Sequence, residues 1–340
     1  MRGGRDIGER APKIAILLGL VAVLVGFPAG GFLWMTSVPG NSYSGPLPPM
    51  TQEQALLAGR LRETVTSVAY EPRNVAYPAA LERAAMQIEA RLRALGYAVR
   101  PQVFEAGGRQ VRNLEIVIEP AAAGAGTLIV GAHYDSHRDS PGANDNGTGT
   151  AAVLELARLL ADLRGRAAIR IRLVLFVNEE PPFFKTDRMG SLVYANRLRQ
   201  SGEEVIGMLS LDTLGYYSDA RGSQHYPFPF NLRYPDRGNF VAFVGSLSSR
   251  SLVRRTVKSF RELVPFPSEG GTAPGFIHGI DWSDHWSFEQ AGFSALMVTD
   301  TATFRFPHYH GTGDTADMVD YDRLARVVWG LSRVIRSWAS

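Results

Sequence analysis

The chain of 340 residues contains no cysteine. Disulfide bridges, zinc sites with cysteine ligands and a cysteine nucleophile are therefore excluded. It also lacks a G-x-S-x-G motif, which disfavours a serine hydrolase. Its glycine-rich turn lacks the Gly-Lys-Ser/Thr ending of a phosphate-binding loop. Acids and bases are interspersed and the net charge is only +3, so we expect no nucleic-acid partner.

A long uncharged segment stands near the N-terminus. Ile14 to Met35 carries no charged residue over 22 positions, which is long enough for a helix to span a bilayer. Lys and Arg precede this segment, and none follows it until Arg60, an asymmetry that places the rest of the chain outside the cytoplasm. We expect a cytoplasmic tail at 1–13, a transmembrane anchor at 14–35, a linker at 36–50 and one folded domain at 51–340. The alternative is a cleaved signal segment and a secreted protein.

Beyond residue 50 the hydrophobic pattern predicts alternating strands and helices. Two amphipathic helices come first and are followed by a hairpin joined across Gly107-Gly108. Strands are expected at 97–104, 111–118, 127–132, 170–177, 205–211, 240–245 and 294–298, and helices at 52–67, 78–95, 147–163, 189–200, 249–263 and 321–337. This alternation is typical of an α/β fold whose mostly parallel sheet is covered by helices on both faces.

Acidic residues and histidines follow the predicted strands. In an open α/β sheet the functional crevice lies outside the carboxyl ends of the strands, so these side chains should meet at one edge. They are His133, Asp135, Glu179, Glu180 and Asp212, with Asp145 in a glycine-rich turn and His308, His310 and Asp314 after the last strand. Imidazoles and carboxylates suit zinc. Without a cation, such a cluster of carboxylates would repel itself.

The spacing of these residues suggests a division of roles. His133 and Asp135 lie two residues apart and share a face, so one can bind a metal while the other supports that ligand. The turn around Asp145 can present a carboxylate with both oxygens free, as a bridge between two cations needs. Glu179 and Glu180 are adjacent and should point in different directions, so one can bind metal while the other acts as a base.

Six segments, in this order and at these spacings, resemble the M28 metallopeptidases, which are co-catalytic zinc aminopeptidases and carboxypeptidases. They are GAHYDS, GANDNGTG, the Glu179-Glu180 pair, SLDTLGY, WSDHWSF and YHGTGDT, and the resemblance covers roughly residues 55–338. It implies a zinc-exopeptidase fold, with a mostly parallel mixed sheet between helices. It implies two zinc ions per chain, bound by His133, Asp145, Glu180, Asp212 and His310, with Asp145 bridging. It further implies Glu179 as general base, Asp135 as the support of His133, and Tyr309 as a hydroxyl that helps stabilise the oxyanion.

We therefore expect a membrane-anchored di-zinc exopeptidase, preferentially an aminopeptidase, acting on peptide or aminoacyl substrates through a metal-bound hydroxide. One alternative is a zinc acyltransferase like the glutaminyl cyclases, which typically use one zinc ion and lack the pair seen at Asp145-Asn146. Another is a non-catalytic peptidase-like ectodomain, which would usually have lost ligands.

One segment departs from the pattern of many relatives, and a second segment is a long irregular stretch. After Glu180 the chain reads PPFFKTDRMGSLVYA, where relatives have a shorter turn, so residues 181–184 either line a substrate pocket or pack a local loop. The irregular stretch 213–238 is a candidate pocket wall. Asp284, in the WSDHWSF segment, is expected to border the pocket. His137 and His308 are expected on the surface or in structural roles, because only His310 has the required spacing to Asp314.

Overall fold

The computed structural model describes residues 26–122 and 126–340. The chain forms two units, 1–37 and 38–340. The described part of the first unit contains helix α2 (Phe27–Thr36). Residues 14–25 of the predicted membrane segment, 14–35, lie outside the described residues. In the rest of the chain, none of the described helices combines the length and the apolar character needed to cross a bilayer.

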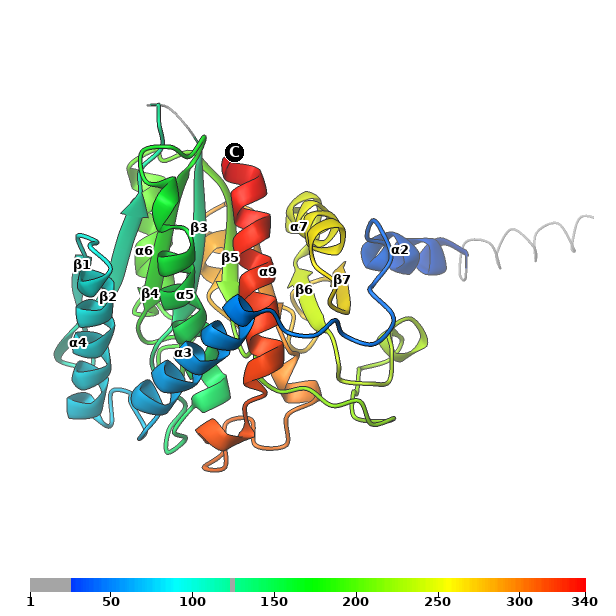
Figure 1. Cartoon of the computed structure of the whole chain (residues 1–340), viewed down its shortest axis with the longest axis horizontal. Helices are drawn as coiled ribbons and strands as arrows, with labels where there is room; N and C mark the ends of the chain where they lie inside the picture. The colour runs from blue at the N-terminus through cyan, green and yellow to red at the C-terminus, as the bar shows by residue number, and fades with distance from the viewer. Residues whose placement is uncertain (1–25, 123–125) are drawn as a thin grey trace, which may run out of the picture. The chain divides into compact units, whose positions relative to one another are not determined.

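The second unit is built on an eight-stranded sheet with the order β1-β2-β4-β3-β5-β8-β6-β7 (Figure 1). The strands are β1 (Arg100–Ala106), β2 (Arg109–Ile118), β3 (Thr127–His133), β4 (Arg170–Phe176), β5 (Val205–Leu211), β6 (Val241–Gly245), β7 (Ser268–Thr272) and β8 (Ala295–Thr299). The central strands β4, β3, β5 and β8 are parallel. The β1–β2, β2–β4 and β6–β8 pairs are antiparallel. The predicted α/β class is confirmed, with a parallel centre and mixed edges.

Helices cover both faces of the sheet (Figure 1). One layer contains α3 (Gln52–Val68), α4 (Pro78–Ala94), α5 (Thr148–Leu159), α7 (Arg250–Leu263) and α9 (Tyr321–Ala339), and the other contains α6 (Gly190–Gln200) and α8 (His285–Gln290). Alternate residues along each strand point toward one or the other layer of helices. Leu128 and Val130 of β3 join the larger core, whereas Ile129 joins the smaller one. This burial on both sides explains the continuous apolar runs of the central strands.

Within the described residues, one strand and one short α-helix were not predicted by the sequence pattern. Strand β7 reads Ser-Glu-Gly-Gly-Thr, and its glycines carry no side chain that could show a strand-like alternation. Helix α8 has six residues, too few for a recognisable helical period. The first strand also begins at Arg100 rather than at residue 97.

Residues 38–50 have no helix or strand, yet they lie against the second unit. Val38, Leu47 and Met50 pack on the larger core. The Arg261 guanidinium donates to the carbonyls of Pro39 and Gly40, and Arg326 donates to the carbonyl of Pro48. The segment is therefore docked on the domain from Val38 onward.

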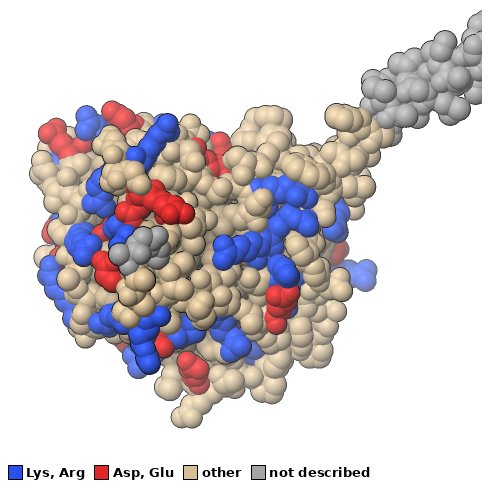
Figure 2. All heavy atoms as spheres, turned by 90° about the horizontal axis from the view of Figure 1, so that it is seen from above, with Lys and Arg blue, Asp and Glu red and all other residues tan. Residues whose placement is uncertain are grey.

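Charged side chains of both signs share the surface. Figure 2 shows lysines and arginines alongside aspartates and glutamates on one face. Many of them form pairs, such as Arg112 with Glu82 and Glu89, and Arg336 with Asp162. Exposed pairs such as Arg336 with Asp162 each contribute only about 0–1 kcal/mol to stability.

Candidate metal centre

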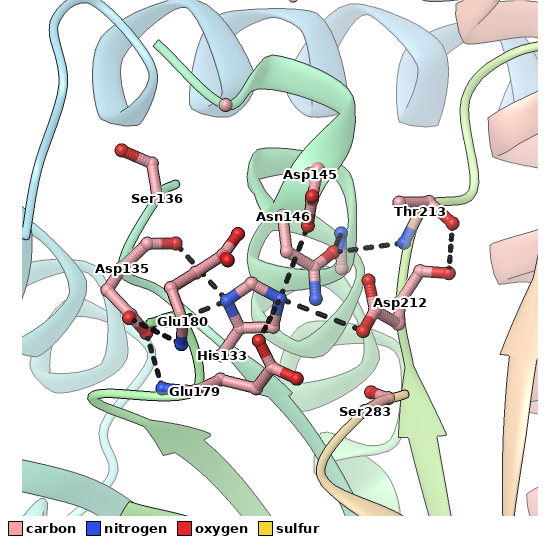
Figure 3. Close-up of polar contacts among 12 residues, drawn as sticks. His133, Asp135, Ser136, Asp145, Asn146, Glu179, Glu180, Asp212, Thr213 and Ser283 are labelled. Atoms are coloured by element: carbon pink, nitrogen blue, oxygen red, sulfur yellow. Dashed lines mark hydrogen bonds and ion pairs between the residues drawn. The ribbon is translucent and has the colours of Figure 1, made fainter. Parts of the chain in front are cut away.

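Three neighbouring parallel strands deliver the predicted ligands to one edge of the sheet. His133 is the last residue of β3, Glu179 and Glu180 follow β4, and Asp212 directly follows β5. All four side chains are buried. Figure 3 shows His133 at the centre, with the carboxylates of Asp145, Asp212 and Glu179 around its ring.

The carboxylate of Asp145 lies between two imidazoles. Its Oδ1 is 3.4 Å from His133 Nε2, and its Oδ2 is 3.2 Å from His310 Nε2. Asp212 Oδ2 is 3.7 Å from His133 Nε2, and Glu180 Oε2 is 3.7 Å from His310 Nε2. The ligand-capable atoms thus fall into two groups. One contains His133, Asp145 and Asp212, and the other contains Glu180, His310 and His137.

These donors fit a divalent cation. His133 Nε2, Asp145 Oδ2 and Glu180 Oε1 are buried without a hydrogen-bond partner among the described residues, and such orphaned atoms are rare unless a ligand or ion satisfies them. Burial raises the pKa of both Glu179 and Glu180. Burial also opposes the charged form of Asp145, but contacts with His133 and His310 outweigh it and hold that pKa below its usual range. Nitrogen and carboxylate ligands in this arrangement suit zinc.

Asp135 organises the site without joining either group. Its Oδ1 lies 3.6 Å from His133 Nδ1, on the side of the ring away from Asp145. Its two carboxylate oxygens accept hydrogen bonds from the backbone N–H groups of Glu179 and Glu180, at 3.2 and 3.1 Å. The backbone carbonyl of Asp135 also lies 3.2 Å from His133 Nδ1, so Asp135 contacts this imidazole through two of its atoms, and its side chain holds the turn after β4.

Hydrogen bonds hold the turn that carries Asp145. The Asp314 carboxylate accepts from the backbone N–H groups of Asn144 and Asp145, at 2.7 and 3.0 Å. Asn146 donates to the carbonyl of Leu211, which ties the turn to the end of β5. Gly149 is required here, because a Cβ atom at that position would lie 2.2 Å from the same carbonyl oxygen.

Three residues at the site adopt left-handed backbone conformations although none is glycine. They are Asn178 (φ 62°), Thr213 (φ 53°) and His310 (φ 60°). Each is either a predicted ligand or the neighbour of a predicted site residue. Backbone strain of this kind persists where the surrounding structure enforces it, and it clusters at functional sites.

Arg73 is a buried residue beside the site that sequence reasoning missed. Its fully buried guanidinium donates to the carbonyls of Tyr134, Pro141 and Gly142, around the chain that leads to Asp145. Burial lowers its pKa to about 10, against the opposing effect of nearby carboxylates. It is a lone arginine in a loop, with no sequence pattern to mark it.

His137 is partly buried and its ring contacts a predicted metal ligand. Its ring stacks on that of His310, with centroids 3.9 Å apart and planes 4° apart. Its Nδ1 is buried without a hydrogen-bond partner among the described residues. His308, in contrast, is exposed. Burial lowers the pKa of His137, and the neighbouring His310 lowers it further. The ring therefore favours its neutral form, in which it packs against a predicted ligand.

The remaining predicted residues border the two groups. Tyr309 stacks on His310, with the two ring centroids 3.8 Å apart. Asp284 is buried at the start of α8, and burial raises its pKa to about 7. The roles assigned to the individual side chains stay predictions, but the structure brings them together.

A large cavity adjoins the metal centre. It holds about 920 Å³ of space, including the part open to solvent, and Asp212, Thr213 and Tyr309 line its inner end. Its walls come from the 213–238 stretch, loop 273–282, residues 301–304 and strands β6, β7 and β8, so the 213–238 stretch forms part of a pocket wall, as predicted. Among the described residues, none from 181–184 lines it. Phe183 instead packs beside Gly107 of the β1–β2 hairpin and on the larger core.

One ion pair joins the segment after the glutamate pair to the cavity wall. Lys185 Nζ lies 2.6 Å from Asp281 Oδ2, and both side chains are mostly buried. The ammonium group also lies over the rings of Phe184 and Trp286, at 5.2 and 5.5 Å from the centroids. The extra residues after Glu180 therefore brace loop 273–282.

The strand-end ligands and the α/β fold define a metal-dependent hydrolase. A model of peptidase family M28 matches residues 113–335. The chain is 39% identical over 260 residues to the protein YfbL of Escherichia coli K12, covering 74% of this chain and 78% of that one. It is 31% identical over 231 residues to a probable zinc metalloprotease of Pyrenophora teres, covering 58% of this chain but only 45% of that protein.

Solved structures share the fold. The LapA aminopeptidase of Legionella pneumophila superposes with a TM-score of 0.66 at 17% identity, over 89% of this chain and 78% of that one. A glutaminyl cyclase of Fimbriiglobus ruber gives 0.62 at 20% identity, over 88% and 99%. The chain belongs to peptidase family M28 and is a zinc metallopeptidase.

Proposed function

We propose that this protein is a di-zinc aminopeptidase in which Glu179 is the general base. The arrangement of the two ligand groups carries the proposal. Asp145 directs one carboxylate oxygen toward an imidazole of each group, whereas Glu179 belongs to neither. Five side chains would hold two zinc ions, and the Glu179 carboxylate would remain available for proton transfer. The five are His133, Asp145, Glu180, Asp212 and His310.

The chain's own residues account for the proton movements. Zinc, when bound, supplies Lewis acidity toward the scissile carbonyl and the attacking water. The Glu179 carboxylate takes a proton from that water and delivers it to the leaving amine. Asp135 fixes the position of Glu179 through its backbone N–H. The Tyr309 hydroxyl donates a hydrogen bond to the oxyanion that develops on the carbonyl.

Aminopeptidase activity is favoured over the action of a cyclase. A leucine aminopeptidase of Arthroderma otae is among the relatives, 27% identical over 58% of this chain. A glutaminyl cyclase shares this fold, so the fold does not distinguish the two activities. The set of metal-ligand residues has to distinguish them. Two ligand groups around a shared Asp145 support a two-metal site. Elemental analysis that finds about one zinc ion per chain would favour the cyclase.

We also propose that the N-terminal segment anchors the enzyme with its catalytic domain outside the cytoplasm. Support comes from the uncharged run at 14–35 and from the Lys and Arg residues that precede it. Protease treatment of intact cells should digest an anchored domain. Recovery of the mature chain in the medium would indicate the secreted alternative.

The variant Glu179→Gln tests the assignment of the base. We expect kcat on a leucyl substrate to fall by about 10²–10⁴-fold while the zinc content stays at the wild-type value, because Glu179 is outside both ligand groups. The full chain should be used, since residues 38–50 are docked on the domain. Glu262→Gln, on the exposed surface of α7, is the matched control. Full activity of Glu179→Gln with both metals bound would rule out this assignment.

A further inference from the structure

The cavity beside the metal centre has a polar end that the proposed hydrolysis does not explain. Its inner end is formed by Asp212, Thr213 and Tyr309, and its far end contains Glu269 of strand β7. Among the described residues that line it, Asp212 and Glu269 are the two carboxylates, and no lysine or arginine is present. A carboxylate that lines a cavity without lysine or arginine favours a ligand that carries a positive charge.

Sheet register places Glu269 on the face that forms the cavity. Glu269 pairs with Ala242 of β6, and Ala242 pairs with Thr299 of β8. All three line the cavity. Thr299 in turn contacts Thr213, beside the end of β5, at 2.8 Å between their hydroxyl oxygens. From β5 to β7 there are three strand spacings, or about 14 Å.

Aromatic rings form the walls between the two ends. Tyr226 and Phe230 both pack near Tyr234, with centroid distances of 5.6 and 6.4 Å. Trp282 and Phe304 also line the cavity. The Tyr234 hydroxyl donates to the carbonyl of Gly270. The Tyr226 hydroxyl is buried and has no hydrogen-bond partner among the described residues. One polar group on the wall is thus available to a ligand.

The charges nearest to Glu269 lie outside the cavity. Arg261 Nη2 is 3.6 Å from Glu269 Oε2, but its N–H groups already donate to the carbonyls of Pro39, Gly40 and Ser268. Burial raises the pKa of Glu269, and Arg261 and Arg233 oppose that rise. The carboxylate therefore has cationic support from Arg261, and the described residues that line the cavity bring no lysine or arginine side chain to it.

We propose that the cavity binds the side chain of an N-terminal lysine or arginine of the substrate, with Glu269 as the specificity-determining residue. The inference rests on the proposed aminopeptidase activity. The aliphatic stem packs between the aromatic rings, and its cation pairs with the Glu269 carboxylate while the Tyr226 hydroxyl accepts a further hydrogen bond. The four-carbon stem of lysine covers only part of the distance of about 14 Å between β5 and β7, so the Cα of the bound N-terminal residue would lie inside the cavity, between Asp212 and Glu269.

A comparison of lysyl and norleucyl substrates tests the proposal. Norleucine keeps the aliphatic stem and lacks the ammonium group. With zinc-loaded, full-length enzyme and aminoacyl p-nitroanilides, we expect kcat/KM for lysyl to exceed that for norleucyl by about tenfold or more, because norleucine offers no cation to the Glu269 carboxylate. Glu269→Gln should reduce this ratio by about tenfold or more. Glu262→Gln, a glutamate on the exposed face of α7, should leave the ratio unchanged.

The outcomes distinguish the proposed role of Glu269 from the proposed aminopeptidase activity. A wild-type preference for norleucyl or leucyl substrates would overturn the proposal for Glu269 and leave the aminopeptidase assignment standing. A Glu269→Gln variant that keeps the lysyl preference would do the same. If that variant does not fold, Tyr226→Phe takes its place and should lower the ratio by a smaller factor. An unchanged ratio in this variant would overturn the role of the cavity. No turnover of any aminoacyl substrate, with both metals bound, would overturn both claims.

Discussion

The edge of the sheet that carries His133, Glu180 and Asp212, here called the metal edge, adjoins the aromatic cavity, and the two regions are built in opposite ways. At the metal edge, the segments that follow parallel strands β3, β4 and β5 hold buried titratable groups at distances of 3.4–3.9 Å. In the cavity, irregular segments and the edge strand β7 surround apolar space with one carboxylate at its far end. The comparison suggests that the rigid centre of the sheet supplies the chemistry, and that its mixed edge supplies the choice of substrate.

Asp145→Asn should show the largest effect, confined to the metal edge. The amide has one oxygen and cannot offer a second anionic ligand atom to the group around His310, now 3.2 Å from Asp145 Oδ2. We expect at least one metal ion to be lost and affinity for zinc to fall by more than about 100-fold, since even residues behind the ligands cost 10–100-fold. Elemental analysis after dialysis measures this. Retention of two zinc ions would contradict a bridging role for Asp145.

Arg73→Met tests whether the metal edge depends on a buried cation that stands behind it. The variant leaves the carbonyls of Tyr134, Pro141 and Gly142 without their donor. It also removes a positive charge that interacts with Asp135. We expect the free energy of unfolding to fall by about 3–5 kcal/mol, measured by urea denaturation. Arg83→Met, which breaks an exposed pair with Glu71, should cost only about 0–1 kcal/mol. Similar losses in both variants would contradict this explanation.

How much the sequence predicts differs between the two regions for physical reasons. Buried parallel strands give continuous apolar runs, and their ends carry the acids and histidines, so β3 and β5 and the cluster around His133 could be anticipated. The cavity depends on long-range register. Glu269 faces it only because β7 pairs with β6, and the sequence of β7 shows no strand pattern. Arg73 was missed for a similar reason, because its partners lie more than 60 residues away.

The ion pair of Lys185 and Asp281 connects the two regions and tests the comparison most finely. Lys185 follows the glutamate pair of the metal edge, whereas Asp281 belongs to the loop that lines the cavity. Lys185→Met keeps the stem and removes the charge, so it should loosen the cavity wall and leave the ligand groups in place. We expect KM to rise several-fold with little change in kcat or zinc content, in line with a coupling of about 1 kcal/mol. The double variant with Asp281→Asn should be no worse than either single variant, because both remove the same contact. A fall in kcat with unchanged KM would instead mean that this segment acts on Glu179, and that the two regions are not separable.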